Sequence, residues 1–236
     1  MIRLSHLGVV VAVLMSGPAM ESRAALEIYY SEPFSIQPES ERPFQLGELN
    51  GQHGWRSIPG VAEVMNWGMA GRRVGVGVRS RGSAFGFETL VTSPIFASIP
   101  QPTGDDYVLT MLFGFTSPDV TWYITPKNIS NNVVVTRIKF ERGGLIWVLV
   151  PDGQGGGAFE LVPNFTWSPR VNYTLVLAAR ADGRLHISID QRQVADFNGA
   201  SFVQGIEAIS IETGNERPGR GMIFDKIRVR DGRIER

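Results

Sequence analysis

Three residues with the chemistry of a hydrolase, His186, Ser188 and Asp190, stand two apart in the segment RLHISID. Their types match a general base, a nucleophile and an orienting acid. On a β-strand, however, residues two apart are separated by about 6.6–6.8 Å with parallel side chains, beyond the ~2.6–3.2 Å of a serine–histidine hydrogen bond. The spacing therefore predicts a polar stripe on one face of a hairpin and no nucleophilic triad.

Glutamate spacing is the second place to look for catalysis. A retaining glycosidase needs two carboxyl groups about 5–5.5 Å apart around one sugar bond. The glutamates of the predicted strands are isolated from one another: Glu88, Glu160, Glu207 and Glu212. Glu207 and Glu212 share one predicted segment but have opposite parity, so they point to opposite faces of a sheet. The pattern argues against a hydrolase or lyase and leaves a site assembled from distant segments as the alternative.

Composition excludes two further classes of function. Cysteine is absent, and the three histidines are His6, His53 and His186. Transition-metal sites such as zinc centres are built largely from cysteine and histidine, so none is expected. The 23 Lys and Arg residues balance 23 Asp and Glu residues, without the basic excess of nucleic-acid-binding proteins. No nucleic-acid partner is expected either.

Tryptophan is the side chain best suited to contact a sugar, because an exposed indole covers the apolar face of a pyranose. Trp147 lies in LIWVLV, which is apolar on both strand faces, and this favours a core position. Trp55 is expected to anchor a loop. Trp67, Trp122 and Trp167 lie near turns, where a ring can be exposed or buried. Of these, Trp67 and Trp122 are the predicted carbohydrate-binding residues.

The elements that must position these residues are β-strands. Segment 106–116 (DYVLTMLFGFT) carries apolar residues at period 2, which is typical of a half-buried strand. Segments 173–179 and 184–190 flank Asp182-Gly183, the preferred dipeptide of a tight hairpin turn. Further strands are expected at 68–82, 132–142, 145–151, 158–163, 206–214 and 221–232. Antiparallel strands at this spacing predict an all-β protein, an antiparallel two-sheet β-sandwich of the jelly-roll kind.

The first 24 residues have the pattern of a signal peptide. Arg3 is followed by the apolar run 7–15 and by small residues around Ala24, as in exported proteins. Nine apolar residues are too few for a membrane span, which needs about 20. We therefore expect residues 25–236 to form a single exported domain, periplasmic or extracellular, with no transmembrane segment in the mature chain.

Three motifs, in this order, resemble the concanavalin A-like lectin/glucanase superfamily, including the laminin G-like jelly rolls of secreted bacterial proteins. The first combines residues 32–34 (EPF) with LGELNGQHGW at 46–55. The second is the hairpin YTLVLAARADGRLHISIDQRQVADF at 173–197, and the third is IFDKIRV at 223–229. The resemblance implies a jelly roll, and it leaves function open among lectins, hydrolases, lyases and adhesion modules.

The same resemblance implies a structural Ca²⁺ between the first and the last strand. The ligands would be Glu32 and Asp225, together with backbone oxygens. Pro33 stands where such domains usually have a second acid.

Taken together, the sequence features lead us to expect a secreted, noncatalytic carbohydrate-binding or adhesion-type domain with a polysaccharide or glycan partner. The alternatives are a glycan-processing enzyme with an atypical site and a structural domain of the cell envelope without a small ligand.

Overall fold

A computed structural model describes ten segments of the chain: 28–32, 44–66, 72–76, 88–93, 107–128, 133–152, 156–180, 184–198, 206–213 and 221–231. The predicted signal peptide (1–24) and the predicted sugar-binding Trp67 lie outside these segments. Within them there is one short 3-10 turn, η1 (Gln52–Gly54), and no α-helix. No helix of the described residues is both long and apolar enough to cross a bilayer.

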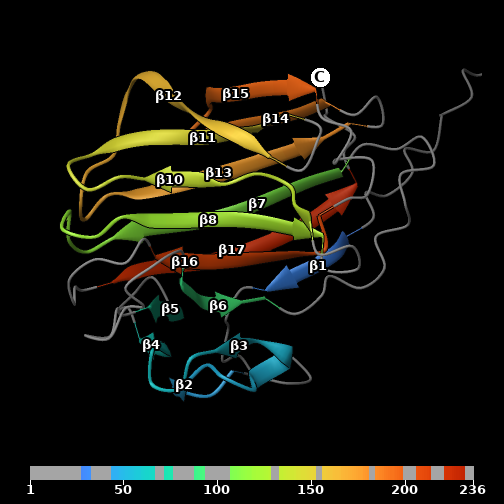
Figure 1. Cartoon of the computed structure of the whole chain (residues 1–236). Coiled ribbons are helices and arrows are strands. Elements are labelled where there is room, and N and C mark those ends of the chain that lie inside the picture. Colours follow the sequence, from blue (N-terminus) through green and yellow to red (C-terminus); the bar gives the residue numbers. More distant parts are fainter. Residues whose placement is uncertain are drawn as a thin grey trace, which may run out of the picture.

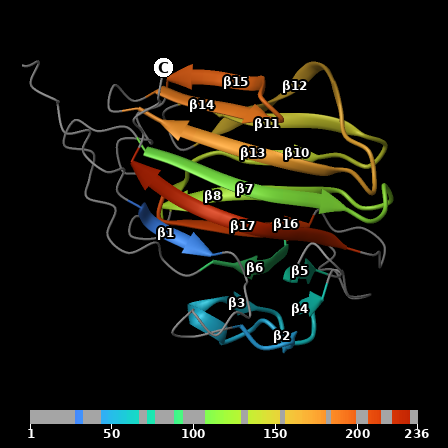
Figure 2. The same ribbon diagram turned by 180° about the vertical axis from the view of Figure 1, so that it is seen from behind.

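The strands form two antiparallel sheets that pack face to face (Figures 1 and 2). The front sheet, which faces the viewer in Figure 1, has the order β12-β11-β10-β8-β16-β6-β3, with β9 beside β8. Its strands are β3 (Arg56–Ser57), β6 (Glu88–Thr92), β8 (Trp122–Asn128), β9 (Val133–Val134), β10 (Ile138–Phe140), β11 (Leu145–Pro151), β12 (Gly157–Thr166) and β16 (Ala208–Thr213).

The back sheet has the order β15-β14-β13-β7-β17-β5-β4-β2, with β1 also paired to β17. Its strands are β1 (Ile28–Glu32), β2 (Gly47–Glu48), β4 (Ala62–Asn66), β5 (Arg72–Val76), β7 (Tyr107–Phe115), β13 (Asn172–Ala179), β14 (Arg184–Ile189), β15 (Arg192–Asn198) and β17 (Met222–Asp231). The architecture confirms the predicted all-β, antiparallel two-sheet sandwich.

Apolar residues at alternate positions along the strands explain why the two sheets pack against each other. In β7, Leu109, Met111, Phe113 and Phe115 are buried on the inner face, as the period-2 pattern predicts. The Phe140 ring of the front sheet lies 5.0 Å from both the Phe113 and the Phe115 rings of the back sheet. Aromatic pairs at this spacing stabilise a core beyond the area that they bury.

The predicted hairpin of segments 173–179 and 184–190 is present, and a second hairpin joins β10 to β11. β13 and β14 pair directly, with Leu177 opposite Ile187. Between β10 and β11, the Glu141 N–H bonds to the Leu145 carbonyl at 2.8 Å, so the turn is longer than the two glycines alone. Gly143 and Gly144 have φ of 92° and 101°, a conformation that residues with a side chain rarely adopt. Glycine is required at both positions to return the chain.

Candidate functional site

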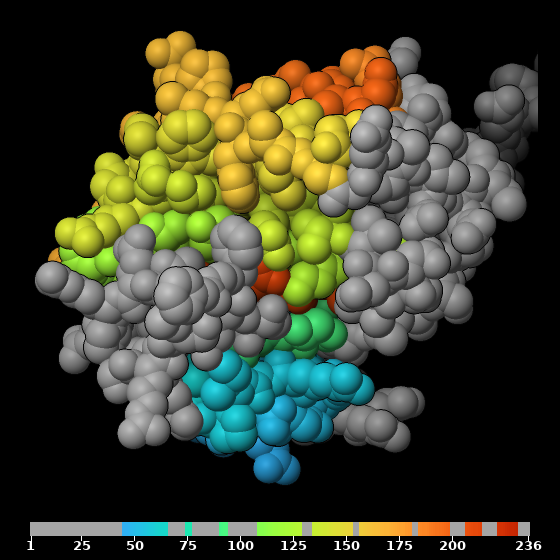
Figure 3. Space-filling model, viewed as in Figure 1, coloured from blue at the N-terminus to red at the C-terminus, as the bar shows by residue number. Residues whose placement is uncertain are grey.

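The outward face of the front sheet, on the side of the molecule seen in Figure 3, carries polar side chains of β8 and β16. In β8, Trp122 and Ile124 point into the core, so the alternating Tyr123, Thr125 and Lys127 point outward. β16 continues this face, because Ser210 pairs with Thr125 and Glu212 pairs with Tyr123. Outward side chains of a sheet are usually solvated, yet Tyr123, Thr125, Ser210 and Glu212 are all buried. These four side chains are therefore sheltered from water, whereas Lys127 on the same face is partly exposed.

Glu212 is the centre of this surface. Its side chain is 1% exposed, and its Oε1 lies 2.6 Å from Lys127 Nζ. Its Oε2 accepts hydrogen bonds from Arg137 Nε at 3.0 Å and from Thr125 Oγ1 at 2.8 Å. A buried carboxylate is strongly unfavourable unless it is paired and hydrogen-bonded. Here two cations and a hydroxyl satisfy it.

The electrostatics keep Glu212 ionised. Burial alone would raise its pKa, but the hydrogen bond and charge of Lys127, the charge of Arg137 and the Thr125 hydroxyl outweigh burial. The pKa therefore lies below the usual value for glutamate. A carboxyl group that acts as a general acid near neutral pH needs a raised pKa instead. Glu212 is a fixed negative charge and not a proton donor.

A second ion pair lies two strands away from Glu212, on β10 and at the end of this strand. Lys139 Nζ is 2.6 Å from Glu141 Oε1 and 5.4 Å from the centre of the Trp147 ring. Trp147 Nε1 donates a hydrogen bond to Glu141 Oε2 at 2.7 Å. The hydrogen bond from Lys139 lowers the pKa of Glu141 below its usual value, with Trp147 contributing in the same direction against partial burial. Lys139 and Glu141 thus hold the half-buried indole in one orientation.

Strand register joins these groups into one straight line. Glu212 is opposite Tyr123, Tyr123 is opposite Lys139, Lys139 is opposite Trp147, and Trp147 is opposite Leu161. Because adjacent strands are about 4.8 Å apart, the line from Glu212 to Trp147 is about 14 Å long. We call Glu212, Tyr123, Lys139 and Trp147 the front-face row. It alternates charged and aromatic side chains across four strands of one sheet.

Two of the tryptophans, Trp122 and Trp147, lie on the opposite strand face from the one expected from the sequence. Trp122 is 0% exposed and lies in the core, 6.4 Å from the Phe115 ring, so the predicted exposure of its ring is wrong. The reason is parity, since Trp122 is in phase with the buried Ile124. Trp167 is buried as well. Trp147, expected in the core, is half-buried and points outward. Of the two predicted sugar-binding residues, Trp67 lies outside the described residues.

One feature of the sequence indicates that Trp147 faces outward. On β10 the charged Lys139 alternates with the buried Ile138 and Phe140. That alternation marks the outer face of the sheet, and the short return through Gly143-Gly144 limits the register with β11. LIWVLV alone is apolar on both faces, so its own pattern carries no direction.

The polar stripe on β14 does not form a triad. His186 Nδ1 lies 3.8 Å from Asp196 on β15. Asp190 accepts a hydrogen bond from the Thr174 backbone N–H at 2.7 Å. His186 and Asp190 are thus directed to different partners, as the strand geometry predicts.

The predicted calcium ligands lie where the first and last strands meet. β1 pairs antiparallel with β17, with Glu32 opposite Ile227, and this confirms that the two strands are neighbours. Asp225 is 2% exposed, and its Oδ1 accepts a hydrogen bond from the Lys226 backbone N–H at 2.7 Å. The described residues hold no cluster of three or more His, Cys, Asp or Glu that could bind a metal. Calcium takes about six to eight oxygen ligands, so most would have to be backbone carbonyls.

Calcium binding at Asp225 remains a prediction. Millimolar Ca²⁺ is expected to raise the melting temperature and a chelator to lower it, because a ligand of the folded state stabilises that state by mass action. Asp225→Asn should abolish the difference, whereas Asp119→Asn, at an exposed turn, should retain it. Thermal unfolding followed by circular dichroism measures both. Equal melting of the unmodified protein in Ca²⁺ and in chelator would contradict the site.

Comparisons with known proteins identify the fold. No protein-family profile matches the sequence, and no curated protein matches it. A solved structure of a carbohydrate esterase from the Shiga toxin-encoding bacteriophage phi24B has a TM-score of 0.58 at 13% identity, covering 88% of this chain and 99% of that one. A PL-14 alginate lyase from Aplysia kurodai has a TM-score of 0.52 at 9% identity, covering 72% and 86%.

A sialidase gives a TM-score of 0.54 at 13% identity, covering 75% of this chain. This chain spans only 17% of the sialidase's length. At such low identity the likeness concerns architecture alone. What these comparisons establish is that the chain has the two-sheet antiparallel jelly-roll fold.

Proposed function

We propose that this chain is a noncatalytic glycan-binding domain of the concanavalin A-like superfamily, which holds its ligand along the front-face row. The observation that carries the proposal is the line of charged and aromatic side chains that register places across β16, β8, β10 and β11. Sugar-binding surfaces combine an aromatic platform with a few fixed polar groups that orient hydroxyls. The front-face row contains both.

Side chains in the front-face row and next to it have separate roles in this proposal. The Trp147 ring, oriented by Glu141 and flanked by Lys139, is the platform for one sugar face. Lys127 and Arg137, which are partly exposed and held in place by the buried Glu212 carboxylate, present charged hydrogen-bonding groups at the other end. Charged groups make shorter and stronger hydrogen bonds than neutral ones.

Stability alone accounts poorly for this arrangement. A buried ion pair is often no better for stability than well-packed apolar residues of the same volume. A cluster of Lys127, Arg137 and Glu212 on the outer face of a sheet is therefore better explained by a ligand than by the fold. Its location on a face away from the core agrees with that role.

Two further considerations support the proposal. The three motifs described above follow the order of the concanavalin A-like superfamily, and the structures most like this chain include a carbohydrate esterase and an alginate lyase. The N-terminal segment fits a domain that meets glycans outside the cytoplasm. Export would appear as loss of about the first 20–25 residues from protein recovered from a Gram-negative host.

The two acids of this face favour binding over hydrolysis. Both Glu212 and Glu141 have pKa values below the usual range, whereas a glycosidase keeps one carboxyl group protonated to act as its acid. Incubation of the protein with alginate, polygalacturonate, xylan and laminarin, followed by a reducing-end assay, tests this directly. Release of new reducing ends would support the enzymatic alternative instead.

Trp147→Ala is expected to weaken glycan binding by about 2 kcal/mol, or roughly thirtyfold in affinity, because a stacking indole is a typical hot spot. The melting temperature should change little, since Trp147 is half-buried and outside the core cluster. Calorimetric titration with the polysaccharide that binds best among the four probes above measures the affinity.

Trp147→Phe is the matched control, because it retains a ring and removes only the Nε1 hydrogen bond to Glu141. Its affinity should lie between those of the unmodified protein and Trp147→Ala. If neither variant alters the affinity for any probe, the front-face row is not the binding surface. If no probe binds the unmodified protein at all, a structural envelope role becomes the better explanation.

A further inference from the structure

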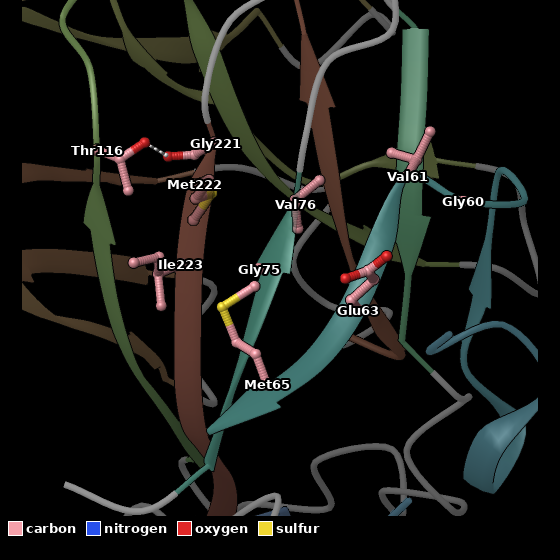
Figure 4. Close-up of a pocket in the computed structure, with 10 residues that line it drawn as sticks. All are labelled: Gly60, Val61, Glu63, Met65, Gly75, Val76, Thr116, Gly221, Met222 and Ile223. Atoms are coloured by element: carbon pink, nitrogen blue, oxygen red, sulfur yellow. Dashed lines mark hydrogen bonds between the residues drawn. The ribbon is translucent and has the colours of Figure 1, made fainter. Parts of the chain in front are cut away.

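A cavity of about 410 Å³ lies at the end of the back sheet, where β5 ends and β17 begins (Figure 4). β4, β5 and β17 contribute to it, so it belongs to the sheet opposite the front-face row. Its volume is within the ~300–1,000 Å³ of typical small-molecule sites. Nothing in the proposed glycan function uses it.

A missing side chain creates the cavity. Gly75 on β5 is opposite Glu63 on β4 and opposite Ile223 on β17. All three face outward, because the alternating Val64, Val74 and Phe224 are buried in the core. Glycine in the middle of the three leaves a hollow between the Glu63 and Ile223 side chains.

Met65 reaches into this hollow from β4. A Cβ added to Gly75 would collide with the terminal methyl of Met65 and would lie 3.1 Å from its sulfur. The thioether therefore occupies the space directly above Gly75, as Figure 4 shows. Methionine is flexible and polarisable, which suits an adaptable wall.

The remaining lining is apolar except for one charge. Val61, Val76 and Met222 contribute aliphatic and thioether surface. Thr116 donates from its hydroxyl and from its backbone N–H to the Gly221 carbonyl, at 3.1 Å and 3.0 Å, so these groups already satisfy one another. Glu63 is exposed and is the one charged side chain among the described lining residues. Within the described part of the chain its carboxylate forms no ion pair.

We propose that this cavity binds a small organic cation, with its apolar body against the Met65 and Met222 side chains and its ammonium group against Glu63. A single carboxylate beside an apolar hollow selects positive over negative ligands by charge complementarity. The described lining residues include no aromatic ring, so they offer no platform on which a sugar would stack. The site is thus chemically distinct from the front-face row.

The test compares three probes of equal chain length: hexylammonium, 1-hexanol and hexanoate. The full chain is labelled at its methionine methyl groups and titrated by NMR. Hexylammonium is expected to shift the Met65 and Met222 resonances saturably, 1-hexanol to do so more weakly, and hexanoate least. Met111 is fully buried and outside the cavity lining, so its methyl resonance is the internal reference.

Two variants separate the charge from the hollow. Glu63→Gln should weaken hexylammonium binding by roughly two- to fivefold, the effect of an exposed ion pair, and leave 1-hexanol binding unchanged. Gly75→Ala should displace the Met65 methyl into the cavity and abolish the shifts from all three probes. Glu160→Gln, at an exposed acid of β12 in the other sheet, is the matched control and should bind as the unmodified protein does.

Several outcomes would overturn the proposal. Shifts that persist in Gly75→Ala would place binding elsewhere. Equal affinity for hexylammonium and hexanoate, in both the unmodified protein and Glu63→Gln, would show an apolar hollow without charge selection. No shift of the Met65 or Met222 resonances with any probe would show that the cavity takes no ligand of this class. None of these results bears on glycan binding at the front-face row.

Discussion

Trp122→Ala is expected to lower the free energy of unfolding by about 3–5 kcal/mol, because it empties a fully buried position between the two sheets. Trp122 is 0% exposed and pairs with Phe140 across β8 and β10. Domains of this kind are stable by only about 5–15 kcal/mol, so the loss is a large share of the total. Urea unfolding followed by far-UV circular dichroism measures it.

Trp122→Phe is the companion variant. It retains most of the aromatic volume and removes the indole N–H, which has no hydrogen-bond partner among the described residues. We expect it to lose less than about 1.5 kcal/mol, the usual bound for a substitution that nearly conserves shape. If Trp122→Ala were as stable as the unmodified protein but lost glycan affinity, Trp122 would be an exposed sugar-binding ring, against its observed burial.

Glu212→Gln is expected to lower the free energy of unfolding by about 3 kcal/mol at pH 7. Removing one partner of a buried ion pair typically costs about 3–5 kcal/mol, because the other charges stay desolvated and unpaired. The lower end applies here, since the Lys127 and Arg137 side chains are 21% and 19% exposed and can recover part of their hydration. Denaturant titration at constant salt gives the value.

The stability that Glu212→Gln loses should depend on pH in a defined direction. In the folded protein the pKa of Glu212 is lowered, chiefly by Lys127 and Arg137 acting against burial. A carboxyl group of this kind contributes stability above its unfolded pKa, about 4.3 for glutamate, and loses it as the pH falls through the folded value. The difference between the unmodified protein and Glu212→Gln should therefore be full above about pH 5 and shrink in more acidic solution.

Glu160→Gln serves as the control for charge removal. Glu160 is an exposed acid on β12, and a surface change of this kind alters stability by less than about 0.5 kcal/mol. The free energies of unfolding of the unmodified protein and of Glu212→Gln are compared from pH 7 to pH 3. If their difference stayed constant over this range, packing and not ionisation would be responsible for the effect of the substitution.

Much of the fold could be predicted from local pattern. The period-2 apolar stripe of 106–116 became β7, with its apolar face in the core. The hairpin around Asp182-Gly183 became β13 and β14. These predictions succeed because alternation and turn chemistry act between residues close in sequence. The resemblance to known jelly rolls also anticipated that β1 and β17 would be neighbours.

The site could not be read in the same way. Glu212 is isolated in the sequence, yet its partners Arg137 and Thr125 are 75 and 87 residues away. Trp122 and Trp147 were assigned to the wrong faces for a related reason. Proximity to a turn does not reveal which face a residue occupies, and LIWVLV is apolar on both faces, so its inner side was undetermined until β11 paired with β10.

The sequence by itself determined many of the longer strands, their antiparallel arrangement and the two-layer architecture, because these follow from alternation, turn residues and the lack of helical period. The tertiary structure alone decided which side chains meet. A shift of register by one residue exchanges the two faces of a strand, so the pairing of β16, β8, β10 and β11 was needed to bring Glu212, Tyr123, Lys139 and Trp147 into one row. Likewise, the hollow above Gly75 exists only because Glu63 and Ile223 lie on either side of it.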